Sequence, residues 1–170
     1  MLALFFFLIC WTSVSSLLSA PLRGAARYNY KRTLSTMHSD ANDIKFGGLH
    51  HCGIIVSNIE ESKLFYKEAF GFSDDSHLRP SVLPFPGAIF GVGSGQIHLM
   101  VLPNPDPTEG RPDHGGRDRH VAVNVKNIDG IRLRLEKRNV QYTMSMTGRR
   151  AVFCRDLDGN AFEFTEDTTL

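Results

Sequence analysis

The sequence predicts an α+β fold built from two βαβββ modules. Two observations predict it: an internal repeat, and the alternation of side chains along the strands of each copy. When His51 is aligned with His120, the stretch HCGIIVSNIE lies over HVAVNVKNID. Near the end of each copy, GQIHLM lies over NAFEFT, so that His98 falls on Glu163. The two halves are therefore expected to be copies of one folding unit.

Each copy is expected to run as a strand, a helix and three further strands. Module one covers residues 48–102 and module two covers residues 118–166, with a short C-terminal tail at 167–170. A proline- and glycine-rich loop joins the modules. The expected elements are strand 49–56, helix 59–70 and strands near 72–78, 86–93 and 95–101, followed by strand 119–125, helix 128–138 and strands near 140–145, 149–155 and 160–165.

Residues that favour helix ends flank both expected helices. Asn58 and Asn127 each stand just before a helix, where an asparagine side chain can cap free backbone N–H groups. Gly71 and Asn139 follow the helices and tolerate the left-handed conformation that closes one. Asp158-Gly159 is typical of a tight hairpin turn, which places a turn between the last two strands.

The first forty residues differ in composition from the rest. The apolar run at residues 2–11 is too short to span a bilayer, which takes ~20 residues, but suits a signal peptide over residues 1–20. Residues 22–39 hold basic and hydroxyl side chains and no acidic one, as in an organelle transit segment, here assigned to 21–40. This bipartite pattern predicts delivery to a plastid through the secretory route. Secretion and a mitochondrial presequence are the simpler alternatives.

The remaining chain is long enough for one compact domain and carries little net charge. Roughly 130 residues follow the leader, a usual domain size. The formal net charge of +1 and the lack of a basic patch with interleaved aromatics argue against nucleic acid as a partner. No stretch after residue 40 is apolar enough to cross a membrane. With only Cys52 and Cys154 left after processing, a disulfide framework is not expected.

Side-chain alternation sets four polar residues apart from the apolar face of each strand. Successive side chains of a strand point to opposite faces. The apolar residues of the first strand share the face expected to pack against the helix, and His51 lies on the other face. The same alternation turns His98, His120 and Glu163 away from their apolar neighbours. His50 falls on the apolar face at the strand entrance, where we expect a structural role.

These four residues form a suitable ligand set for a metal ion. If the modules pair their sheets into one curved barrel, three imidazoles and a carboxylate converge on its axis. A buried carboxylate needs a partner, and a divalent cation supplies one. The set suits Zn²⁺, Ni²⁺, Co²⁺, Fe²⁺ or Mn²⁺. For any single histidine, a hydrogen-bonded core position is the simpler interpretation, but repeat-related positions with one parity favour a metal.

The motifs that carry this pattern resemble those of the vicinal oxygen chelate (VOC) superfamily. They are HCGIIVSNIEESKLFYKEAFGF, GQIHLMVLP, RHVAVNVKNID and FCRDLDGNAFEF, in which Leu157 stands where the family usually has proline. The superfamily includes glyoxalase I, fosfomycin- and bleomycin-resistance proteins and extradiol dioxygenases, and the chain is most similar to small plant and cyanobacterial glyoxalase I-like proteins. The resemblance implies an open eight-stranded mixed β-barrel. It also implies one divalent ion held by four ligands: His51, His98, His120 and Glu163.

The activity that this resemblance implies is that of a metal-dependent glyoxalase-like lyase or isomerase. A small substrate, a glutathione adduct being one candidate, would chelate the metal through adjacent oxygens. Glu163 would take a proton from the carbon next to a carbonyl. Glyoxalase I typically has a carboxylate where this chain has His98. Arg117 and Arg149 are the candidates for binding anionic groups of the substrate, although an arginine taken alone is usually a surface charge.

Three alternative activities remain open from the sequence. An extradiol-type dioxygenase normally uses two histidines and one carboxylate, so four protein ligands leave it fewer open positions. A transferase of the fosfomycin-resistance type and a non-catalytic small-molecule-binding protein are the others. The family builds its site within one chain or across a dimer, so a homodimer is a candidate assembly. Gly115-Gly116 would also allow the joining loop to move as a lid.

Overall fold

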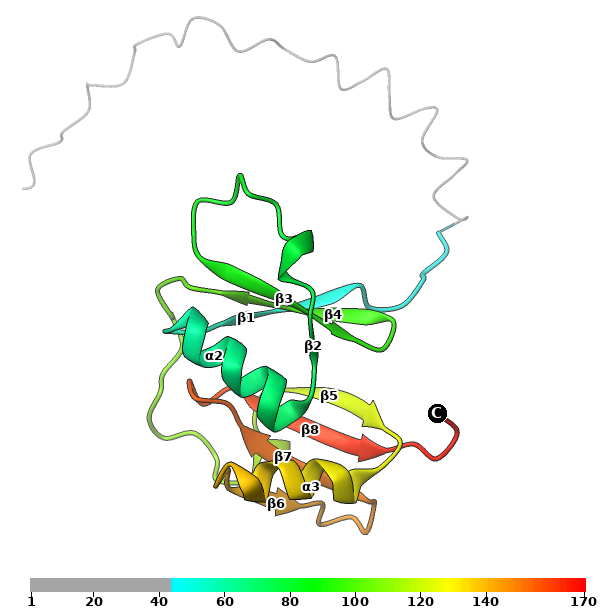
Figure 1. Cartoon of the computed structure of the whole chain (residues 1–170). Coiled ribbons are helices and arrows are strands. Elements are labelled where there is room, and N and C mark those ends of the chain that lie inside the picture. Colours follow the sequence, from blue (N-terminus) through cyan, green and yellow to red (C-terminus); the bar gives the residue numbers. More distant parts are fainter. Residues whose placement is uncertain (1–43) are drawn as a thin grey trace, which may run out of the picture. The chain divides into compact units, whose positions relative to one another are not determined.

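The structure is a computed structural model that describes residues 44–170. The expected signal peptide (1–20) and transit-like segment (21–40) lie outside the described residues. One compact unit runs from Gly47 to Leu170 and contains both predicted modules (Figure 1). Within residues 44–170 there is no helix of the length and apolarity that a membrane span requires.

Both modules have the βαβββ order that the repeat predicts. In module one, the helix α2 continues into a π-helical segment, and a short 3₁₀ turn follows the second strand. The elements of module one are β1 (His51–Ile55), α2 (Ile59–Phe65), the π-helical segment (Tyr66–Phe70), β2 (Ser73–Asp74), the 3₁₀ turn (Ser76–Leu78), β3 (Gly87–Val92) and β4 (Gly95–Met100). Those of module two are β5 (His120–Val125), α3 (Ile128–Lys137), β6 (Tyr142–Met144), β7 (Ala151–Arg155) and β8 (Ala161–Glu166), preceded by a 3₁₀ turn (Gly115–Arg117).

Each module forms its own four-stranded mixed sheet with the same strand order. The orders are β1-β4-β3-β2 and β5-β8-β7-β6, and in each sheet only the pair β1–β4 or β5–β8 is parallel. The two sheets remain separate, which agrees with an open architecture. The prediction of a strand near 72–78 is wrong for most of these residues. Only Ser73–Asp74 pairs with β3, and the following residues turn into 3₁₀ geometry because Asp74 accepts hydrogen bonds from the backbone and hydroxyl of Ser76.

The residues predicted to begin and to close the two helices are confirmed in these roles. The Asn58 side chain accepts hydrogen bonds from the backbone N–H groups of Glu60 and Glu61, at 3.1 and 3.3 Å. Asn127 accepts one from Gly130 at 3.1 Å. Gly71 and Asn139 adopt positive φ angles of 80° and 55°, as left-handed helix closure requires. Local sequence signals therefore determine the entry and exit of both helices.

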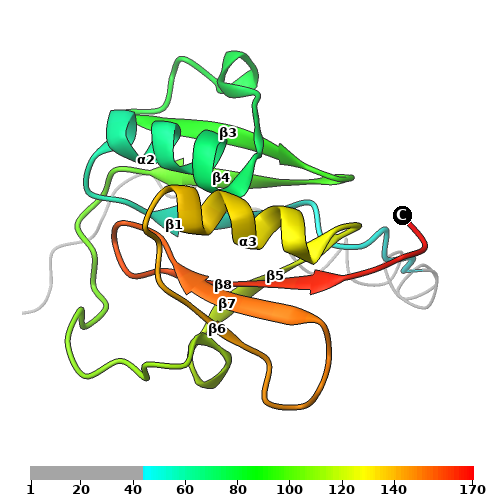
Figure 2. The ribbon, with the colours of Figure 1, turned by 60° about the horizontal axis from the view of Figure 1, so that its bottom comes forward.

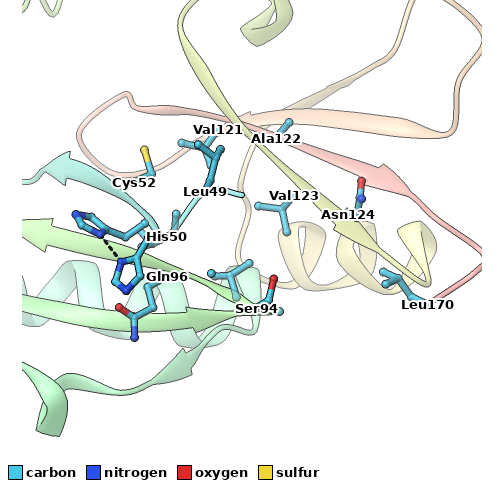
Figure 3. A pocket seen from close by; sticks show the side chains of 15 residues that line it. Leu49, His50, Cys52, Ser94, Gln96, Val121, Ala122, Val123, Asn124 and Leu170 are labelled. Atoms are coloured by element: carbon cyan, nitrogen blue, oxygen red, sulfur yellow. Dashed lines mark hydrogen bonds between the residues drawn. The ribbon is translucent and has the colours of Figure 1, made fainter. Parts of the chain in front are cut away.

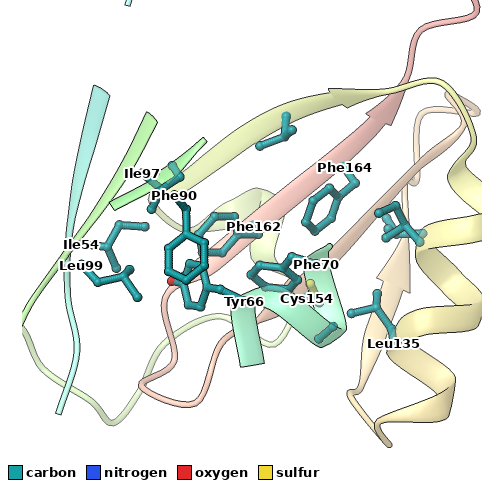
Figure 4. Packing of buried hydrophobic residues seen from close by; sticks show 14 of the residues in the cluster. Ile54, Tyr66, Phe70, Phe90, Ile97, Leu99, Leu135, Cys154, Phe162 and Phe164 are labelled. Carbon is teal, nitrogen blue, oxygen red and sulfur yellow. The ribbon is translucent and has the colours of Figure 1, made fainter. Parts of the chain in front are cut away.

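A single hydrophobic core joins the two modules. Figure 2 shows α2 and α3 side by side in front of the strands. Phe70 of module one packs against Phe162 and Phe164 of module two, with ring centroids 4.8 and 5.1 Å apart (Figure 4). Tyr66 is fully buried and contacts Phe162 as well, at 5.6 Å. Since these rings bridge the two sheets, the modules are held as one body from the helix side.

The turn DLDGN adds polar contacts across the same joint. The buried carboxylate of Asp156 accepts a hydrogen bond of 2.7 Å from the Tyr66 hydroxyl of module one. The Asn160 side chain donates to the Ile55 carbonyl at 3.0 Å, and Asp158 accepts from the backbone N–H of Ser57 at 3.0 Å. Burial raises the pKa of Asp156, although its hydrogen bonds oppose that shift. This turn therefore fastens the start of β8 to module one.

Candidate functional site

The four candidate ligands lie on the faces that the alternation predicts. Ile54 and Val56 of β1 are buried in the core, and His51 points away from it. Beside it, Gly53 of β1 stands opposite His98 of β4 in the parallel register. In module two, Ala122 of β5 stands opposite Glu163 of β8 in the same way. At Gly53, a Cβ atom would meet the end of the Met100 side chain at 3.0 Å, so Met100 packs beside this position.

Module one contributes a half-site made of two histidines, which we call the His51 half-site (His51 and His98). Their rings stack in parallel, with centroids 4.1 Å apart and planes within 5°. His51 Nδ1 lies 2.8 Å from His50 Nδ1, and His98 Nε2 lies 2.8 Å from Gln96 Oε1. Burial lowers the pKa of His98, and the neighbouring His51 and His50 lower it further. The neutral imidazole, which is the form that binds metal ions, is therefore favoured at His98.

Module two contributes a charged half-site, which we call the Glu163 half-site (His120 and Glu163). The side chain of Glu163 is only 5% exposed, so its carboxylate is buried and needs polar partners. Its Oε2 lies 3.1 Å from His120 Nε2, and its Oε1 lies 3.1 Å from an Arg149 guanidinium nitrogen. The Phe153 ring meets the His120 ring edge-on at 5.7 Å and closes one side of the half-site. The buried carboxylate thus lies between an arginine on one side and an imidazole on the other.

The hydrogen bonding of His120 indicates that a cation fits between it and Glu163. His120 Nδ1 lies 2.8 Å from the Asp118 carbonyl oxygen, which can only accept, so Nδ1 carries the proton. In the neutral imidazole, the Nε2 lone pair then points at a carboxylate oxygen that also has only lone pairs to offer. A proton or a metal ion must lie between two such atoms. Imidazole nitrogens and a carboxylate are suitable donors for a divalent transition metal, so the residues fit the expected ion.

One chain does not bring all four ligands together. Within residues 44–170, no group of three or more His, Cys, Asp or Glu side chains lies close enough to hold a metal ion. The single-chain convergence of His51, His98, His120 and Glu163 expected from the alternation is therefore not observed. Each module presents two of the four.

Of the two arginines expected to bind substrate, Arg149 reaches the candidate ligands. Arg117 is exposed on the 3₁₀ turn before β5. Three neighbouring arginines are paired with carboxylates outside the half-sites: Arg111 bonds Asp118 at 2.8 Å, Arg119 pairs with Asp106, and Arg150 pairs with Asp129 and Glu166. Arg149 is the arginine whose position bears directly on the chemistry of Glu163.

The loop before β5 is fixed at its C-terminal end. Gly115 is buried, and a Cβ atom there would meet Phe153 and Ala161 at 3.3 and 3.5 Å. A Cβ on Gly116 would meet the His114 and Phe153 rings at 3.0 and 3.1 Å. The two glycines thus serve close packing in this structure. His114 is half-buried against Phe153 and accepts a hydrogen bond from the Gly116 backbone.

A cavity opens beside the His51 half-site, where β1 faces β5. It has a volume of about 340 Å³ and is lined by the entrance of β1, the β3–β4 hairpin, residues 121–124 of β5 and Leu170 (Figure 3). His50, His51 and Gln96 border it. Sequence reasoning missed the contacts of Gln96 and His50. Gln96 lies two residues before His98 on the same face of β4, so strand alternation could have identified it as a neighbour of that ligand. His50 lies just outside β1, where strand alternation no longer applies.

Comparisons with known proteins agree with the fold. The family model described as Glyoxalase/Bleomycin resistance protein/Dioxygenase superfamily matches residues 48–164. Glyoxylase I 4 of Arabidopsis thaliana is 28% identical over 141 residues, covering 79% of each chain. A glyoxalase family protein from Bacillus anthracis superposes with a TM-score of 0.60 at 24% identity, covering 73% of this chain and 98% of the other.

One further solved structure holds a metal. A point mutant of the fosfomycin resistance protein FosX from Listeria monocytogenes, in complex with Mn(II) and 1S,2S-dihydroxypropylphosphonic acid, has a TM-score of 0.56 at 19% identity. It covers 73% of this chain and 95% of its own. Given the family match, the chain belongs to the glyoxalase/bleomycin resistance/dioxygenase superfamily.

Proposed function

We propose that the protein is a metal-dependent, glyoxalase-like lyase or isomerase. The observation that carries the proposal is the pairing of His120 Nε2 with the buried carboxylate of Glu163, two lone-pair donors that need a shared cation. The two stacked histidines of the His51 half-site add further nitrogen donors. Membership of the superfamily and the likeness to a FosX structure with Mn(II) support this choice.

The complete metal site, on this proposal, forms between two copies of the chain. The His51 half-site of one subunit would face the Glu163 half-site of the partner subunit. Support comes from the separation of the two pairs within residues 44–170. Further support comes from β1 and β5, which are the outer strands of their sheets and could pair with another strand. Pairing β1 with β5 of a second copy would complete the open eight-stranded barrel.

Each residue of the site then has a defined task. A divalent ion bound there would polarise a substrate carbonyl and fix two adjacent oxygens. Glu163 would accept the proton from the carbon next to that carbonyl, since it supplies the carboxylate that lies between the two half-site groups, His120 and Arg149. Arg117, exposed on the loop beside β5, would bind an anionic group of the substrate. Arg149 could bind an anionic group in the same way, and it also holds the Glu163 carboxylate through a hydrogen bond.

Metal analysis followed by a turnover screen tests this function. Purified protein without the leader is expected to bind one divalent ion per chain and to convert methylglyoxal plus glutathione with at least one of Ni²⁺, Zn²⁺, Co²⁺ or Mn²⁺. His120→Ala is expected to lose the ion, and His77→Ala, which changes an exposed histidine away from the half-sites, is expected to keep it. Wild-type protein without bound metal would favour a non-catalytic binding protein. Turnover of an epoxide or a catechol instead would favour the transferase or the dioxygenase.

We also propose that the leader directs the protein to a plastid through the secretory route. The support is the apolar run at 2–11 followed by the basic segment at 22–39. Fusion of residues 1–40 to a fluorescent protein tests it. Plastid fluorescence is expected, whereas mitochondrial or extracellular fluorescence would identify one of the alternatives.

A further inference from the structure

Each half-site contains a polar side chain, outside the four candidate ligands, that engages one atom of a ligand. Gln96 engages His98, and Arg149 engages Glu163. We propose that Gln96 and Arg149 are positioning residues: each fixes one polar atom of its ligand, so that the other atom is presented to the cation. This inference rests on the proposed metal site and assigns the donor atoms within it.

Gln96 sets the protonation pattern of the His98 ring. The two residues share a face of β4, and the Gln96 backbone N–H is itself fixed by the His50 carbonyl at 3.1 Å. The Gln96 side-chain oxygen lies 2.8 Å from His98 Nε2 and can only accept, so Nε2 carries the proton. In a neutral imidazole, the lone pair is then on Nδ1. Stacking on His51 holds the ring plane, so Nδ1 is the atom of His98 that is offered as a ligand.

Arg149 determines in the same way which carboxylate oxygen of Glu163 is free to bind a cation. It stands on the hairpin between β6 and β7, where its guanidinium also donates to the Thr147 hydroxyl at 3.3 Å. Its hydrogen bond of 3.1 Å to Glu163 Oε1 leaves Oε2, which faces His120, as the oxygen free to bind a cation. A charge-assisted bond to a buried carboxylate is stronger than a neutral one, so this orientation is well defined.

The next residue along the chain provides a matched control. Arg150 follows Arg149 directly, but its guanidinium bonds Asp129 and Glu166, outside both half-sites. Replacing either arginine removes one positive charge from the same hairpin. Only the Arg149 replacement releases a candidate ligand, so a difference between the two variants reports positioning and not net charge.

The tautomer of His98 tests the inference without any metal. Two-bond ¹H–¹⁵N spectra of histidine-labelled, metal-free protein at pH 8 should show His98 with its proton on Nε2. Gln96→Leu should move His98 towards the Nδ1-protonated tautomer, and Gln96→Glu, whose carboxylate also accepts, should restore the Nε2 proton. His98 protonated on Nδ1 in the wild type, or no change in Gln96→Leu, would overturn the assignment.

Titration with Co²⁺, followed by its visible absorption, tests the consequence for binding. Loss of a residue that orients a ligand typically weakens metal binding by about 10–100-fold. We expect losses of that size in Gln96→Leu and Arg149→Leu, recovery in Gln96→Glu, and wild-type affinity in Arg150→Leu. Wild-type affinity in all four variants would overturn the inference while leaving the metal site intact. A wild-type protein that takes up no Co²⁺ would instead overturn the proposed function, and the His98 tautomer would still decide the role of Gln96.

Discussion

The two modules have the same architecture but divide the chemistry unequally. Module one offers two stacked histidines, and module two offers a histidine and a buried carboxylate that is bonded to Arg149. The difference arises at one repeat-related position, where His98 of β4 corresponds to Glu163 of β8. The repeat therefore preserves the direction in which a side chain points, while the residue type decides whether a half-site supplies only ligands or also a base.

The largest effect is expected from removing the carboxylate of Glu163, which the His51 half-site lacks. Glu163→Gln keeps the size of the side chain but removes its basicity, so kcat for methylglyoxal plus glutathione should fall by ~10²–10⁴-fold. The measurement is kcat at saturating metal, with circular dichroism to verify folding. Near-normal turnover in this variant would show that the modules do not differ in the way we propose.

Two buried residues at equivalent positions of the repeat test whether the modules share one hydrophobic core. Phe162 of β8 and Ile97 of β4 are repeat-related and both buried, but Phe162 also packs on Tyr66 and Phe70 of the other module. Phe162→Ala should lower the free energy of unfolding by about 3–5 kcal/mol, as large aromatic truncations do. Ile97→Ala should cost about 2–5 kcal/mol and serves as the comparison in chemical denaturation. A smaller loss for Phe162→Ala than for Ile97→Ala would argue against one core spanning both modules.

Acid should weaken module two at Asp118, which has no counterpart in module one. Hydrogen bonds from Arg111, and then from Arg155, hold the pKa of Asp118 well below its usual range, although burial opposes them. Because the folded-state pKa is lowered, the stabilisation is complete above pH ~4, the unfolded value, and is lost as the pH falls further. Asp118→Asn should therefore cost about 1.5–3 kcal/mol at pH 7 and progressively less below pH 4.

Asp113→Asn is the control for that experiment, since Asp113 is an exposed aspartate of the same loop. Its unfolding free energy should follow the wild type at every pH. A constant difference between Asp118→Asn and the wild type from pH 7 to pH 3 would be inconsistent with an ionised Asp118 that stabilises the fold.

The smallest effect is expected at the polar contact between the modules. Tyr66→Phe removes the hydroxyl that donates to Asp156, while Asn160 and two backbone N–H groups still satisfy that carboxylate. The expected loss is about 1 kcal/mol, the net value of one hydrogen bond, measured by urea denaturation. A loss as large as that of Phe162→Ala would mean that the turn DLDGN, and not the aromatic core, holds the modules together.

Much of the fold can be predicted from local sequence signals, but the way in which the four candidate ligands would meet cannot. Alternation along β1, β4, β5 and β8 reports which face each side chain occupies, and Asn58 and Asn127 mark the helix starts. These signals act within a few residues. Where one sheet lies relative to the other depends on how rings such as Phe70 and Phe162 pack over long sequence separations, which periodicity does not encode.

Subunit complementation tests the central claim, that one metal site takes half of its ligands from each of two chains. One variant lacks the His51 half-site (His51→Ala with His98→Ala) and the other lacks the Glu163 half-site (His120→Ala with Glu163→Ala), so neither should bind Co²⁺ alone. After the two are unfolded together and refolded, half of the dimers are mixed, and each mixed dimer has one intact site. About a quarter of the wild-type Co²⁺ sites should therefore return. No recovery, with mixed dimers demonstrated by native mass spectrometry, would contradict the account.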